Sequence, residues 1–169
     1  MSIVQALLPQ FDHEMATTRR VLEVVPGSDA AWRPHPKSSS LGGLAAHIAL
    51  LPHWGTLVLQ ERELDLGLPA SASSASMPFT TVPELLSRFD SHVRDTRAAL
   101  EPMSDEAMRE SWTLKNRGVT VFSMPRVAVL RGFILSHLIH HRGQLTVYLR
   151  LRDVPVPSVY GPTADSRPP

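Results

Sequence analysis

The sequence predicts an all-α fold, a four-helix bundle with a short hairpin-like insert before the last helix. Three observations lead to this prediction. Four long segments repeat apolar residues at the spacing of amphipathic helices, a weakly alternating stretch precedes the last of them, and no part of the chain repeats another. With 169 residues the chain has the length of a single domain, residues 1–169, and buries a sizeable core without disulfides.

The first two predicted helices span residues 3–25 and residues 41 to about 63. Pro9 either kinks the first helix or marks its true first turn, since proline is tolerated only near a helix start. Ser40 has the side chain of an N-cap and precedes the second helix. Pro52 lies inside the second helix, where it removes one main-chain hydrogen bond and is expected to bend the axis.

The third helix follows a low-complexity connector. Residues 66–79 are dominated by serine, alanine and proline, which predicts a connector and a candidate flap. Thr81 and Glu84 have the spacing of a capping box, so the third helix is expected to begin after Thr81. Pro102 marks its end.

The insert and the last helix complete the chain. Residues 109–123 alternate weakly around the turn sequence NRG, which predicts two short strands or an irregular hairpin. The last helix begins near Pro125 and runs to Arg152, a length of about 40 Å at 1.5 Å per residue. The proline-rich tail, residues 154–169, is expected to pack irregularly over the outside of the domain or over a partner.

Composition excludes several classes of protein. Seventeen basic and sixteen acidic residues leave a net charge of +1, and no basic run exceeds Arg19-Arg20, so no nucleic-acid partner is expected. The absence of cysteine excludes disulfides, thiolate ligands and a cysteine nucleophile, so any thiol in a reaction must arrive as a substrate. No signal-peptide pattern and no membrane-spanning run are present, so a cytoplasmic protein without membrane contact is expected.

The stretch SHLIHHRGQL, residues 136–145, carries three histidines in five positions. At about 100° per residue, His137 and His141 lie about 40° apart, on an apolar stripe of the last helix. Gln144 lies about 20° to the other side of His137, whereas His140 lies about 100° from His141. The spacing of His137 and His141 is one by which two imidazoles of one helix bind one metal ion.

A third histidine has a similar position on the second predicted helix. His47 lies on an apolar stripe with Leu44 and Leu51, so it is also expected to face the bundle interior. Metal sites in bundles are built from facing side chains in the core, and three neutral imidazoles leave open coordination positions, as in catalytic zinc sites. The alternative is that His47, His137 and His141 are core histidines hydrogen-bonded to the main chain.

Other polar residues near these histidines have two interpretations. Arg142 and Gln144 are candidates for supporting a ligand or contacting a substrate. Arg142 is equally well interpreted as a partner in a surface ion pair. The remaining histidines are expected on the solvated surface: His13, His35, His53 and His92.

These segments resemble the DinB/YfiT-like family of small metalloproteins. The resemblance rests on LGGLAAHIALLPHW, HLIHHRGQLTVYLR and DVPVPSVYGPTAD, and extends from about residue 5 to 165. It implies a bundle with an unusual crossing connection, often a homodimer. It also implies a divalent ion, zinc or nickel foremost, bound by His47, His137 and His141, with His140 outside the ligand set.

The resemblance also implies a class of reaction. It places the chain near thiol-dependent members of the wider superfamily, such as mycothiol-dependent maleylpyruvate isomerases and bacillithiol transferases. The first hypothesis is therefore a metal-dependent enzyme that transfers a low-molecular-weight thiol, as co-substrate, to an electrophilic small-molecule substrate. The alternatives are a metal-dependent hydrolase, a non-enzymatic stress protein that binds a metal or small ligand, and a structural bundle without a metal. No catalytic acid or base is identified.

Overall fold

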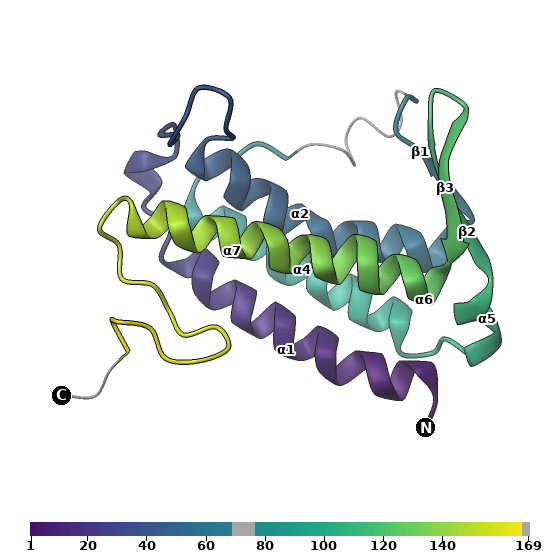
Figure 1. Ribbon diagram of the computed structural model, residues 1–169. Helices are drawn as coiled ribbons and strands as arrows, with labels where there is room; N and C mark the ends of the chain where they lie inside the picture. The colour runs from purple at the N-terminus through teal and green to yellow at the C-terminus, as the bar shows by residue number, and fades with distance from the viewer. Residues whose placement is uncertain (69–76, 167–169) are drawn as a thin grey trace.

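The computed structural model describes residues 1–68 and 77–166. The fold is mostly helical, with one small three-stranded sheet at one end of the helices (Figure 1). The prediction of an all-α protein is therefore wrong in this respect, although the four long helices are present. These are α1 (Ile3–Glu23), α2 (Leu41–Gln60), α4 (Val82–Leu100) and α7 (His137–Arg150).

The four long helices pack so that helices consecutive in sequence are not always neighbours in space. Helix α1 packs on α4 and α7, and α2 packs on the same two helices. Helices α1 and α2 are therefore at opposite corners. Figure 1 shows that α2 and α4 run in the same direction, so the chain must return along the molecule between them. The middle of that connection, residues 69–76, includes most of the predicted flap and lies outside the described residues.

The helix starts follow the capping residues. The Ser40 and Thr81 side chains each accept a main-chain hydrogen bond from the first turn of α2 and α4, as predicted. The reciprocal half of the predicted capping box at Thr81 does not form. The Glu84 carboxylate instead accepts hydrogen bonds from the Thr80 hydroxyl and the Arg88 guanidinium, both at 2.6 Å. The hydrogen bond from Arg88 is charge-assisted and therefore stronger than a bond from the main-chain N–H of Thr81, which explains why the Glu84 carboxylate turns toward Arg88.

The predicted hairpin is confirmed and is part of a larger sheet. Strands β2 (Ser111–Asn116) and β3 (Val119–Pro125) are antiparallel, and β1 (Glu63–Asp65) pairs with β2 in parallel. The short helix α5 (Asp105–Arg109) precedes β2. Asp65 at the end of β1 accepts main-chain hydrogen bonds from the β2–β3 turn, which explains how a strand of three residues is held.

The last helix is not one continuous α-helix. The chain runs through α6 (Arg126–Val129), a π-helical segment (Leu130–Ser136) and then α7. Inside the wide turn, the Ser136 hydroxyl donates to the carbonyl of Arg131 at 2.9 Å. Such π-helical insertions occur often at functional sites, because they rotate the residues that follow them. This one ends directly before His137.

The core extends from the helices to the base of the sheet. Trp112 of β2 is 1% exposed and Met108 of α5 is fully buried, so both close the end of the helical core. By length and composition α2 is apolar enough to cross a membrane, but 78% of its most apolar window is buried inside the protein. Its apolar character is therefore that of a central core helix.

Candidate metal centre

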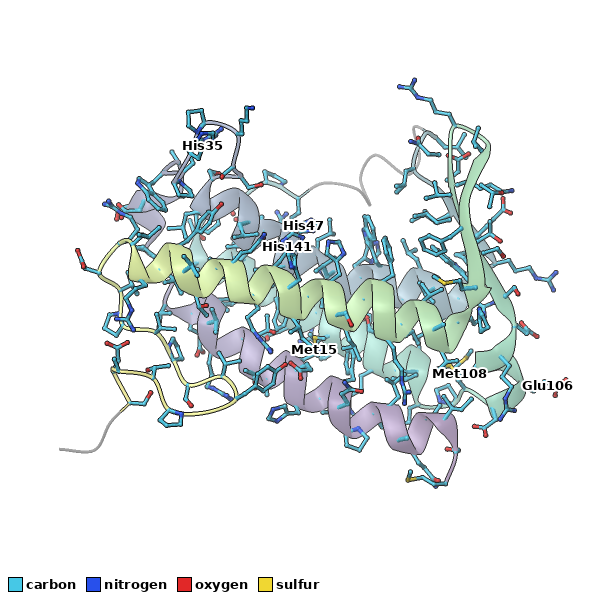
Figure 2. All side chains as sticks on the ribbon, viewed as in Figure 1. Met15, His35, His47, Glu106, Met108 and His141 are labelled. Carbon is cyan, nitrogen blue, oxygen red and sulfur yellow. The ribbon has the colours of Figure 1, made fainter. Side chains whose placement is uncertain are left out.

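The three histidines singled out in the sequence meet on the side of the molecule where α2 and α7 pack together. Figure 2 shows His47 of α2 next to His141 of α7. The Nε2 atoms of His47 and His137 are 3.3 Å apart, and the three ring centroids are separated by 4.6 to 5.1 Å. Within residues 1–68 and 77–166 this is the one group of three or more histidine or acidic residues spaced to hold a metal ion.

The spacing of the nitrogen atoms fits a metal centre. Two nitrogens bound at about 2.0–2.1 Å and at the tetrahedral angle lie about 3.3–3.4 Å apart. The 3.3 Å between the Nε2 atoms of His47 and His137 matches this value. One ligand atom from each of the three rings lies within 4.8 Å of the other two, a spacing at which one ion can contact all three rings.

A hydrogen bond to Gln144 orients the ring of His141. The Nδ1 of His141 lies 2.7 Å from the Oε1 of Gln144, so Nδ1 carries the proton and Nε2 keeps its lone pair. This type of contact orients metal-ligating histidines in general. The Nδ1 of His137 is buried beside the main chain of Phe133, without a hydrogen bond of ordinary geometry among the described residues. Gln144 therefore lies against the site.

Burial keeps the three imidazoles neutral. Loss of hydration and, to a smaller extent, the neighbouring His141 and His137 together lower the pKa of His47 to about 4. Burial is also the main cause that lowers the pKa values of His137 and His141. A metal ion requires deprotonated imidazoles, so these half-buried rings are in the ligating form at neutral pH without a change in protonation.

The metal-free protein is expected to lose stability as the pH falls from about 6.5 to about 4. Between these values the unfolded His47 binds a proton that the folded His47 does not, so acid favours the unfolded chain. Urea unfolding at pH 7 and pH 5 measures the effect. The decrease should be smaller in His47→Leu. Asp165, with a pKa of about 2, stays ionised across this window. Equal pH dependence in both proteins would contradict the prediction.

Arg142 lies on a different side of α7 from the histidines. Its guanidinium is 2.7 Å from the Glu14 carboxylate of α1 and also donates to the Thr18 hydroxyl and to the hydroxyl of Tyr160. Arg142 is only 1% exposed and Glu14 only 5%. The structure therefore places Arg142 neither beside the three histidines nor on the surface. His140 is exposed and outside the metal-spaced group, although its ring is 5.0 Å from that of His141.

Aromatic side chains form a border beside the three histidines. The Phe133 ring lies 5.7 Å from that of His137, stacks on Trp54 at 5.4 Å, and meets the edge of Phe122 at 5.4 Å. Phe133 precedes His137 by four residues, so helical spacing alone placed it on the same face. The contribution of Phe122 depends on how β3 packs, which no local pattern indicates.

Comparison with known proteins agrees with this fold. A family model described as the DinB superfamily matches residues 10–145. The crystal structure of a DinB-like protein from Bacillus cereus has a TM-score of 0.69 and 21% identity, over 92% of this chain and 97% of that chain. The crystal structure of a DinB-like protein from Bacillus subtilis has a TM-score of 0.67 and 22% identity, over 93% of this chain and 96% of that chain. At these identities the likeness concerns the fold. No curated protein matches the chain.

Proposed function

The chain belongs to the DinB superfamily, and from this membership and its histidine cluster we propose that it binds a divalent metal ion through His47, His137 and His141. The observation that carries the proposal is the convergence of three half-buried imidazoles from two helices, with two Nε2 atoms 3.3 Å apart. Three histidines without a carboxylate suit zinc or nickel, and they leave coordination positions for other ligands.

We further propose that the site is catalytic and transfers a small thiol to an electrophile. When bound, the ion supplies a positive charge that lowers the pKa of a thiol or water at an open position. The chain's own residues hold the ligands: Gln144 orients His141, and burial keeps His47 unprotonated. In the transfer a sulfur–carbon bond forms, the leaving group departs with its electron pair, and the thiol proton passes to solvent.

Two features of the chain bear on this choice of reaction. The chain has no cysteine, so a thiol that takes part must come from a co-substrate, which permits thiol transfer without favouring it. The ring of Phe133 lies beside that of His137 and stacks on Trp54, and such an aromatic neighbour suits an apolar body on the electrophile. Hydrolysis by metal-activated water uses the same open positions and is the second candidate. A non-enzymatic stress protein that binds a metal or small ligand is the third.

A metal-dependent activity is the expected result. The untagged protein should consume low-molecular-weight thiols in the presence of chlorodinitrobenzene, lose this activity when stripped by a chelator, and regain it when zinc or nickel is returned. Several thiols and a set of esters should be screened in parallel. Turnover of esters alone would favour the hydrolase. Metal binding without turnover would favour the binding protein. The homodimer implied by the family resemblance stays a prediction.

A further inference from the structure

A second pair of histidines lies between α2 and α4, apart from the three histidines of the candidate metal centre. His53 of α2 and His92 of α4 were expected on the solvated surface, but both are half-buried and their ring centroids are 5.2 Å apart. This separation is close to those in the three-histidine group. His53 follows His47 by six residues and therefore lies about 120° around α2 from it.

The His92 ring is oriented for ligation. Its Nδ1 lies 2.9 Å from the main-chain carbonyl of Ala49. A carbonyl oxygen only accepts hydrogen bonds, so Nδ1 carries the proton and the neutral ring keeps its lone pair on Nε2. Main-chain carbonyls commonly orient metal-ligating histidines in this way. The ring of His141 is oriented in the same way, by a hydrogen bond from its Nδ1 to the Oε1 of Gln144.

The helices that carry the pair are held firmly against each other. One turn after His92, the Thr96 hydroxyl donates to the carbonyl of Pro52 and lies 2.9 Å from the Thr56 hydroxyl. A Cβ atom at Gly55 would lie only 2.8 Å from the Thr96 side chain, so α2 and α4 are in close contact there. The positions of His53 and His92 are therefore fixed by the packing of these helices.

A carboxylate lies near this pair of histidines. Asp95 is exposed and follows His92 by three residues, so both side chains extend from the same part of α4. Burial and the adjacent His92 lower the pKa of His53, whereas Asp95 acts in the opposite direction, as a nearby negative charge does. Two imidazoles and a carboxylate form a mixed nitrogen and oxygen ligand set for a first-row transition metal.

We propose that His53, His92 and Asp95 form a second site for a divalent transition metal at the surface between α2 and α4. As they stand, these three side chains are not spaced to hold an ion, whereas the three-histidine group is. An ion must therefore draw the two rings and the carboxylate together, so binding at this site is weaker than at the three-histidine site. Copper(II) is the best probe, since it binds nitrogen ligands most tightly among the common divalent ions.

Copper titration of a protein that lacks the first site tests the proposal. The probe is Cu²⁺ added to the untagged full-length chain carrying His47→Ala, His137→Ala and His141→Ala, followed by calorimetry and electron paramagnetic resonance. One equivalent should bind with nitrogen hyperfine coupling. Adding His53→Ala should weaken binding by at least about tenfold, and Asp95→Asn by a smaller factor. The matched control is His35→Ala, an exposed histidine in the loop before α2, which should change nothing.

The proposal would be overturned by a lack of Cu²⁺ binding to the triple variant, or by an affinity that His53→Ala leaves unchanged. If the triple variant does not fold, the wild-type protein preloaded with one equivalent of Cu²⁺, which fills the tighter three-histidine site, replaces it. A second equivalent of Cu²⁺ should then bind and should be weakened by His53→Ala. Loss of binding in His35→Ala would assign the copper to a surface histidine and would also overturn the second site.

Discussion

Replacing His47 with alanine is expected to abolish stoichiometric metal binding. His47 is the ligand that α2 contributes, and without it only His137 and His141 of α7 remain in the group. Because loss of a hydrogen-bond partner of a ligand already costs about 10–100-fold in metal affinity, loss of a ligand should cost at least about 100-fold. Metal analysis after dialysis against metal-free buffer, followed by competition with a chromophoric chelator, measures the change.

A graded set of variants separates ligands from neighbours. His140→Ala is the matched control, because its ring lies 5.0 Å from that of His141 but its nitrogens are outside the metal-spaced group. Gln144→Leu removes the acceptor of the His141 hydrogen bond and should lower affinity by about 10–100-fold without changing the stoichiometry. If His47→Ala keeps one tightly bound ion, or if His140→Ala loses it, the assignment of the site fails.

The meeting of the three histidines was predictable because each lies on the apolar stripe of a long amphipathic helix. Helical spacing placed His137 and His141 on one face, and the apolar neighbours of His47 showed that it faces inward. Periodicity reports which side of a helix is buried, but it does not report which element covers that side. The packing of α2 on α7, which brings His47 to the other two, was therefore inferred from the pattern of the whole bundle.

Features that depend on contacts between distant elements were missed. Arg142 follows His141 directly, yet about 100° of helical rotation turns it toward Glu14, whose position 128 residues earlier no local pattern indicates. His53 and His92 look polar and exposed in sequence, and only the close packing of α2 on α4 half-buries them. Strand β1 is three residues long, too short for an alternating pattern to be recognised.

Arg142→Met is expected to lower the free energy of unfolding by about 3–5 kcal/mol, the cost of breaking a buried ion pair at one partner. The Glu14 carboxylate would stay buried after losing the guanidinium 2.7 Å away, and among the described residues only the Tyr160 hydroxyl would still donate a hydrogen bond to it. The Thr18 hydroxyl would lose its bond to the guanidinium as well. Urea unfolding of the metal-free protein measures this loss.

Two comparisons identify the cause of that destabilisation. Arg88→Met breaks an exposed pair with Glu84 and should change the free energy of unfolding far less than Arg142→Met does, because solvent screens the exposed charges. The double variant Arg142→Met/Glu14→Leu should recover part of the loss, because no unpaired charge stays buried. The folded Arg142→Met protein should still bind one metal ion, since the guanidinium contacts α1 and the C-terminal tail rather than the histidines. Loss of the ion with unchanged stability would instead assign Arg142 to the metal site.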